Sequence, residues 1–236
     1  MELNSRSSAA EAIRIVRTNL EFMISDLPKE ACKVIFSTST FPGEGKTFIS
    51  ANIAATVALS SKKTLLIGMD IRNPKLNEYL NIPSVGITNF LSNKEAKISD
   101  YIVNIPNYES FDVLPAGTIP PNPAELLMSN KMETMFAELR SQYDYIIVDT
   151  APISLVTDTL LIAKYADAFI YVIRSGKLDK QLLNIPETLY KENKLPRMSI
   201  LLNDTDSTKG YGYGYGYGVD KEVKSIPIWK KVLGIK

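Results

Sequence analysis

The sequence contains no histidine and a single cysteine, Cys32, among its 236 residues. Histidine-based acid–base catalysis and histidine-ligated metal sites are therefore excluded, and no internal disulfide can form. Cys32 is expected to be a small buried residue beside a strand rather than a reactive thiol. No run reaches the roughly 20 apolar residues of a membrane-spanning helix. Acidic and basic residues nearly cancel, 26 against 27, so no strong basic field marks a nucleic-acid-binding protein.

What the sequence does contain is enough apolar material for a sizeable core, because 45% of its residues are hydrophobic. Apolar runs rich in β-branched residues predict buried strands, and they alternate with segments of helical period. This order predicts an α/β fold, a mostly parallel sheet of about six strands with helices on both faces. The strands are expected at 33–39, 64–69, 111–117, 143–149, 168–174 and 198–204, and single helices at 7–26, 124–142, 157–166 and 179–192.

Three regions follow from this pattern. Residues 1–28 form an N-terminal helix in which Ala9, Ile13, Val16 and Leu20 make an apolar stripe, and residues 29–204 form the core domain. Residues 205–236 differ in composition: a Gly–Tyr run precedes a short, basic, amphipathic end. That end is either an unpacked tail or a surface helix packed on the core.

A phosphate-binding loop is predicted where FSTSTFPGEGKTFIS follows a strand and opens a helix. Its GKT matches the end of the P-loop pattern G-x-x-x-x-G-K-[ST], although Thr40 stands at the first glycine. Gly43 and Gly45 let backbone N–H groups approach phosphate oxygens, and the helix N-terminus adds positive potential. Lys46 would contact the β- and γ-phosphates, and Thr47 would offer a hydroxyl to Mg²⁺. The alternative is a glycine-rich turn that arises by chance.

Two acids follow apolar strands and are candidates for the same site. Asp149 ends YIIVD, where a carboxylate should be exposed at the carboxyl edge of the sheet beside the P-loop. Asp70 follows TLLIGM, with Arg72 two residues further on. The alternatives are that Asp149 caps the following turn and that Asp70 and Arg72 form a salt bridge within a turn.

Taken together, these segments resemble the cytoplasmic kinase domain of bacterial tyrosine kinases, the family coupled to capsule and exopolysaccharide export. The family's Walker A motif matches PGEGKT, its D-x-D-x-R motif falls on GMDIRNP, and its Walker B motif matches VDTAP. LPAGTIPPNPAELL, the helix EAIRIVR and the tyrosine cluster complete the likeness, which covers nearly the whole chain. One departure is Gly68, which replaces the first aspartate of D-x-D.

The resemblance implies an ATP- and Mg²⁺-dependent protein-tyrosine kinase. Lys46, Asp70 and Asp149 would serve catalysis, and Asp70 would contact the metal or orient the tyrosine hydroxyl. With Gly68 at the first position of the motif, either Asp70 does both jobs or activity is low; the loose transition state of phosphoryl transfer makes early deprotonation of the tyrosine less necessary. The metal ligands would be Thr47, Asp70 and Asp149, and the nucleotide-binding residues Gly43, Glu44, Gly45, Lys46, Thr47, Phe48 and Asn203, the last of them near the adenine.

The run KGYGYGYGYGVD alternates glycine and tyrosine, although glycine is a poor strand former. In a tyrosine kinase the run has a role as substrate, because glycine keeps the backbone pliable and lets each hydroxyl reach an active site. The phosphoacceptors would be Tyr211, Tyr213, Tyr215 and Tyr217, phosphorylated in trans within an oligomer. The alternatives are an ordinary surface loop and a low-complexity segment that associates with itself or with RNA.

The resemblance also implies partners and a location. Glu11, Arg14 and Arg17 would mediate a ring-shaped homo-oligomer, although their spacing also fits a solvated helix face. A transmembrane polysaccharide copolymerase or activator segment and a cognate tyrosine phosphatase are the other expected partners, at the cytoplasmic face of the inner membrane. Two rival functions remain: a P-loop ATPase of the partitioning or septum-placement type, and a nucleotide-gated regulatory module without tyrosine transfer. The first usually has a lysine near the start of its loop, where this chain has Phe41.

Overall fold

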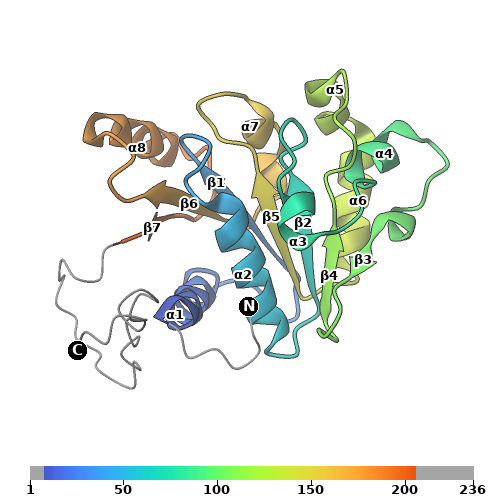
Figure 1. The fold of residues 1–236 in the computed structure, drawn as a ribbon, viewed down its shortest axis with the longest axis horizontal. Coiled ribbons are helices and arrows are strands. Elements are labelled where there is room, and N and C mark those ends of the chain that lie inside the picture. The colour runs from blue at the N-terminus through green and yellow to red at the C-terminus, as the bar shows by residue number, and fades with distance from the viewer. Residues whose placement is uncertain (1–7, 206–236) are drawn as a thin grey trace, which may run out of the picture.

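The structure is a computed structural model, and it describes residues 8–205. One mixed sheet runs through its centre, in the strand order β3-β4-β2-β5-β1-β6-β7 (Figure 1). All neighbouring strands are parallel except β3 and β4. The strands are β1 (Lys33–Ser39), β2 (Thr64–Met69), β3 (Val103–Asn104), β4 (Phe111–Leu114), β5 (Tyr145–Thr150), β6 (Ala168–Arg174) and β7 (Met198–Asn203).

The predicted α/β class and all six predicted strands are confirmed. The seventh strand, β3, was not predicted, because it has two residues and pairs antiparallel with β4 at the sheet edge. A two-residue strand has no alternation that a sequence pattern could detect. In the described part of the chain, no helix combines the length and apolar composition needed to cross a membrane.

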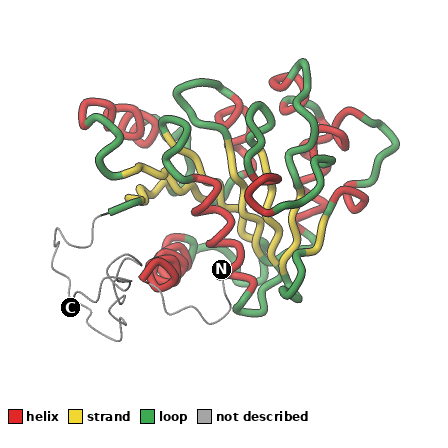
Figure 2. Tube along the Cα trace, viewed as in Figure 1, coloured by secondary structure: helices red, strands yellow, loops and turns green. Residues whose placement is uncertain are grey.

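Helices cover both faces of the sheet, as Figure 2 shows. The predicted helix over 124–142 is wrong as a single element: the chain breaks it around Ser129, whose extended backbone begins a new helix. The helices are α1 (Ser8–Met23), α2 (Lys46–Ala58), α3 (Leu76–Leu80), α4 (Ile87–Ser92), α5 (Pro123–Leu127), α6 (Asn130–Arg140), α7 (Asp158–Ile162) and α8 (Asn184–Lys191), with 3₁₀ turns at Ile98–Tyr101, Ala163–Tyr165 and Lys180–Leu183.

Alternate residues of the buried strands pack into two apolar layers, one on each face of the sheet. Phe36 of β1 faces the layer that α6, α7 and α8 complete, and its ring lies 6.1 Å from that of Phe136. Its neighbour Ile35 faces the opposite layer, which α1, α2 and α3 complete. Both strand residues are at most 1% exposed, so the sheet is covered on both sides, as a parallel sheet requires.

Helix α1 belongs to the same apolar layer as α2. Its buried residues are Ala10, Ile13 and Leu20, so the expected stripe is correct at Ile13 and Leu20. The predicted place of Ala9 in that stripe is wrong, because Ala9 is exposed and Ala10 is buried instead. The N-terminal helix is therefore packed on the core domain.

The strand order fixes where a site can form. β1 lies between β5 and β6, and β5 lies between β1 and β2. The carboxyl ends of β1, β5 and β2 are therefore adjacent, which is where parallel α/β sheets place their ligands.

Candidate functional site

The loop between β1 and α2 has the backbone shape of a phosphate cradle. Gly43 and Gly45 adopt left-handed conformations, with φ of +81° and +96°, and Gly45 caps the N-terminus of α2. A side chain at Gly45 would bring its Cβ within 2.2 Å of Asn203 Nδ2. Glycine is thus favoured at Gly45 by its left-handed conformation, and a larger residue would also displace the side-chain amide of Asn203.

Thr40 shows how the loop accommodates a departure from the glycine of the P-loop pattern. Its side chain is fully buried, and its hydroxyl lies 2.9 Å from the hydroxyl of Tyr171. The carbonyl of Thr40 accepts a hydrogen bond from the backbone N–H of Ser154 at 3.2 Å. The first position of the pattern is therefore anchored in the core, and the glycines that shape the loop follow it.

Glu44 stabilises the phosphate loop through a hydrogen bond inside it. Its side chain is 3% exposed, and its Oε2 accepts a hydrogen bond from the backbone N–H of Phe41 at 2.7 Å. Phe41 thus holds the loop's first turn through its main chain, at the position where partitioning ATPases carry a lysine. The predicted contact of Glu44 with nucleotide stays a prediction.

Thr47 and Asp149 are in direct contact, and the predicted exposure of Asp149 is wrong because its side chain is buried. The hydroxyl of Thr47 donates to Oδ2 of Asp149 at 2.6 Å, because β5 pairs with β1 in the register Ser37↔Asp149. Asp149 is 3% exposed, and its Oδ1 has no hydrogen-bond partner among the described residues. Burial raises the pKa of Asp149 to about 6, against the opposing effects of the Lys46 charge and the Thr47 hydrogen bond.

Asp70 completes the cluster from the next strand. Gly68 pairs with Asp149 in the β2–β5 register, so Asp70 lies just beyond the end of β5. Its Oδ1 accepts the backbone N–H of Asn73 at 3.1 Å. Burial raises the pKa of Asp70, whereas the charge of Lys46 lowers it, so the lysine lies within electrostatic reach of both carboxyl groups. The structure thus brings Lys46, Asp70 and Asp149 together.

Gly68, which stands at the first aspartate of the motif, is closely surrounded by its neighbours. A Cβ at this position would lie 3.1 Å from the backbone nitrogen of Ala116 and 3.2 Å from Cδ2 of Leu76. Both contacts are tighter than ordinary van der Waals separation, so α3 and the segment after β4 close over the strand here. Any larger residue would have to push these neighbours away.

Arg72 does not pair with Asp70, so the alternative of a salt bridge within the turn is wrong. Its guanidinium instead holds Asp158 with two hydrogen bonds, Nε to Oδ2 at 2.7 Å and Nη2 to Oδ1 at 2.9 Å. Asp158 is the first residue of α7, and its side chain is 2% exposed. This pair ties the Asp70 loop to the segment that follows Asp149, and sequence reasoning missed Asp158.

Replacing Arg72 by alanine should lower the free energy of unfolding by about 2–3 kcal/mol, because it leaves the buried carboxylate of Asp158 without its cation. Lys75→Ala in the same loop is the control. Its ion pair with Glu78 has 56% and 73% exposed side chains, so its loss should cost less than about 1 kcal/mol. Urea unfolding at pH 7 measures both, and equal losses would contradict the assignment.

Asn203 and Phe48 line a cavity beside the phosphate loop. The side-chain amide of Asn203 donates from Nδ2 to the carbonyl of Glu44 at 2.9 Å, so the end of β7 is bonded to the loop. The cavity measures about 430 Å³ and lies between α1, the first turn of α2 and the end of β7. Phe48 is 41% exposed, which leaves its ring accessible. Asn203, predicted near the adenine, and Phe48, predicted among the nucleotide-binding residues, thus line one cavity.

The three residues of the E-x-x-R-x-x-R helix have different surroundings. Glu11 and Arg14 form an exposed ion pair at 2.8 Å. Arg17 instead contacts the end of α2 within the same chain, donating to the carbonyl of Thr56 in that helix and to the hydroxyl of Ser60 just after it. Their role in an oligomer stays a prediction. The predicted phosphoacceptors, 211–217, lie outside the described residues.

The donor set fits a magnesium–nucleotide complex. Within residues 8–205 there is no group of three or more His, Cys, Asp or Glu side chains that could enclose a metal ion. Mg²⁺ in nucleotide sites needs no such cage, because it takes one or two protein oxygens together with phosphate and water. The hydroxyl of Thr47 and the unpartnered buried oxygen of Asp149 offer that arrangement.

Comparisons with known proteins agree with this geometry. The model of the AAA domain family matches residues 32–194. The tyrosine-protein kinase YwqD of Bacillus subtilis is 39% identical over 177 residues, which are 75% of this chain and 73% of that protein. The tyrosine-protein kinase wzc of Salmonella typhimurium is 32% identical over 201 residues, 85% of this chain but 27% of that protein. The solved kinase domain of the Escherichia coli tyrosine kinase ETK superposes with a TM-score of 0.75 at 28% identity, over 88% of this chain and 81% of that one.

The fold is also shared with more distant P-loop proteins. The septum site-determining protein MinD of Pyrococcus horikoshii, solved with Mg-ADP, superposes with a TM-score of 0.58 at 20% identity, over 72% of this chain and 70% of that one. This likeness concerns the fold alone. The stronger similarity lies with the tyrosine-protein kinases.

Proposed function

This chain belongs to the AAA domain family and, within it, to the bacterial tyrosine-protein kinases, and from that premise we propose that it transfers the γ-phosphoryl group of ATP to its own carboxyl-terminal tyrosines. The observation that carries the proposal is the contact between Thr47 and Asp149 beneath the phosphate loop, with the second oxygen of Asp149 left unpartnered. That arrangement offers oxygen ligands of the kind that Mg²⁺ uses together with nucleotide phosphates.

Each residue of the site has a role in the proposed reaction. When bound, Mg-ATP supplies the transferable phosphoryl group and the cation that neutralises its charge. The backbone N–H groups of residues 43–47 and the ammonium of Lys46 hold the phosphates, and Thr47 and Asp149 hold the metal or its water shell. Asp70 orients the acceptor hydroxyl and takes its proton late, since the loose transition state demands little early deprotonation.

The base of the nucleotide is proposed to lodge in the cavity of about 430 Å³ next to the loop. The exposed ring of Phe48 offers an apolar surface, and Asn203 offers an amide at the mouth of the cavity. A cavity of this volume is within the usual range for small-molecule pockets.

The acceptors are proposed to be Tyr211, Tyr213, Tyr215 and Tyr217, phosphorylated in trans within a homo-oligomer that Glu11, Arg14 and Arg17 help to form. A flexible segment of about 14 residues reaches roughly 20 Å by the square-root rule, and up to about 45 Å when extended. The chain matches 27% of wzc, which supports a role as the kinase part of a larger protein. We also propose two partners, a transmembrane copolymerase or activator segment and a tyrosine phosphatase. The proposed location is the inner face of the membrane, and the proposed role is control of exopolysaccharide or capsule export.

Intact-mass measurement after incubation with Mg-ATP tests the proposed function. We expect successive increments of one phosphate, which disappear when the four tyrosines of 211–217 are replaced by phenylalanine. This result separates the kinase from both rivals, since a partitioning-type ATPase and a nucleotide-gated module would leave the mass unchanged. An unchanged mass despite measured ATP binding would refute the proposal.

A further inference from the structure

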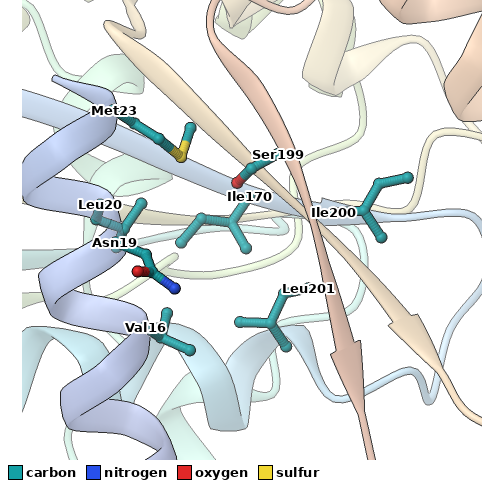
Figure 3. Close-up of a pocket in the computed structure, with 8 residues that line it drawn as sticks. All are labelled: Val16, Asn19, Leu20, Met23, Ile170, Ser199, Ile200 and Leu201. Atoms are coloured by element: carbon teal, nitrogen blue, oxygen red, sulfur yellow. The ribbon is translucent and has the colours of Figure 1, made fainter. Parts of the chain in front are cut away.

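A second concave surface lies on the opposite side of α1 from the solvent and has no part in the proposed reaction. Figure 3 shows it between α1 and the last two strands, with Val16, Leu20 and Met23 on the helix. Ile170 and Leu201 face them from β6 and β7 (Figure 3). We call this surface the α1–β7 groove; its lining is Val16, Asn19, Leu20, Met23, Ile170, Ser199, Ile200 and Leu201.

The groove is apolar and contains no charged lining residue. Its volume is about 140 Å³, similar to the roughly 150 Å³ that accept a benzene-sized ring in an apolar protein cavity. β7 is the last strand of the sheet order and pairs only with β6 within the described residues. Leu201 of this strand is only partly buried, and its neighbours Ile200 and Leu202, whose side chains point to the other face of the sheet, are each 56% exposed. A strand edge with this much apolar surface is normally covered.

The chain itself carries a segment of matching chemistry directly after β7. Ile226, Ile228, Trp229, Val232 and Leu233 place apolar side chains at helical spacing, with lysines between them. The proposed kinase site uses the tyrosines of this region and leaves these residues without a role. The uncharged groove suits them, because the lysines can stay in water while the apolar face is buried.

The length of the intervening chain fits as well. About 20 residues separate Thr205 from Ile226, and a flexible chain of that length spans roughly 25 Å. The groove begins beside Leu201, near the point where the chain leaves β7, and extends along a strand that is roughly 20 Å long. The segment can therefore reach the groove of its own chain, at an effective concentration of the millimolar order.

We propose that residues 226–235 dock in the α1–β7 groove of the same chain, with the ring of Trp229 inserted among Leu20, Met23 and Leu201. The tyrosines would then lie on a loop anchored at both ends, beside the end of β7 that is bonded to the phosphate loop. Only that consequence for the tyrosines rests on the proposed function. The docking stands on the groove and on the apolar segment.

Trp229 reports on the docking directly, because it is the only tryptophan in the chain. In the full-length protein we expect its emission to be shifted to shorter wavelength and its quenching by acrylamide to be several-fold weaker than for free tryptophan. Met23→Lys places a charge in the groove and should restore solvent-like emission and quenching. Phe22→Lys is the matched control, because it adds the same charge at the adjacent position of the helix. Phe22 is 73% exposed and does not line the groove, so the emission of Trp229 should not change.

Two further arms keep the test decisive. If Met23→Lys lowers the helical circular dichroism signal, the variant Ile228→Asp is used in its place, because it alters only the docking segment. We expect the same shift of Trp229 to solvent-like emission. Solvent-like Trp229 in the unaltered protein would overturn the proposal, as would protection that Met23→Lys and Ile228→Asp leave intact. Protection that is lost on dilution would assign the groove to a second copy, and protection that appears only with phosphatidylglycerol vesicles would assign the segment to a lipid surface. Either result overturns docking within one chain.

Discussion

Replacing Lys46 by methionine is expected to lower tyrosine phosphorylation by about 10³-fold or more, because it removes the positive charge that holds the β- and γ-phosphates as they separate. Lys46 is 7% exposed at the first position of α2, and methionine has a similar length and shape. The apolar layer beneath the helix should therefore be kept. Intact mass after incubation with Mg-ATP measures the loss, and circular dichroism checks the fold.

The same variant separates transfer between chains from transfer within a chain. A Lys46→Met chain with intact tyrosines is mixed with an active chain whose tyrosines at 211–217 are phenylalanine. If acceptors of one chain enter the site of another, phosphate appears on the Lys46→Met chain, which has no activity of its own. Each protein alone provides the control. A mixture that stays unlabelled would contradict transfer in trans, and the test with the unaltered chain would still decide whether the protein is a kinase.

The core of the site could be predicted because local signals and sheet geometry agree. The strand at 33–39 is followed by a glycine loop and a helix N-terminus at Gly43–Thr47, an order typical of a phosphate cradle. Asp149 could be placed beside it, because the carboxyl ends of parallel strands share one edge of a sheet. Asp70 followed by the same rule from β2.

What could not be predicted depends on partners far apart in the chain or on small differences in helix phase. Arg72 pairs with Asp158 on α7, 86 residues away, and no local spacing in the sequence predicts such a pair. The amide of Asn203 bonds the carbonyl of Glu44, a contact that only the closed sheet creates. The break at Ser129 has neither proline nor glycine to mark it, so the periodic pattern runs through it unchanged.

Asp149→Asn should abolish tyrosine phosphorylation and at the same time stabilise the ligand-free protein at pH 8. The carboxyl group of Asp149 is buried, which raises its pKa from 3.8 to about 6 in the folded state. The folded protein therefore binds this proton more tightly than the unfolded chain does. As pH rises from about 4 to about 6, the group lowers the free energy of unfolding, by up to roughly 3 kcal/mol, and above that range the full cost is present. Asparagine never carries the charge, and its amide oxygen can still accept the hydrogen bond from Thr47.

Urea unfolding of both proteins between pH 4 and pH 8, without nucleotide, measures this effect as a difference. We expect the asparagine variant to gain stability relative to the unaltered protein as pH rises, and the two curves to run parallel above about pH 7. Adding Mg-ATP should make the unaltered protein the more stable of the two. The bound cation compensates the charge of the Asp149 carboxylate, whereas it interacts only weakly with the amide of the variant. The ligand-free protein would then keep an uncompensated buried charge that lowers its stability, as expected where function requires such a charge. A stability difference that does not depend on pH would show that Asp149 is already charged at pH 4 in the folded protein, and the electrostatic account of the site would have to be abandoned.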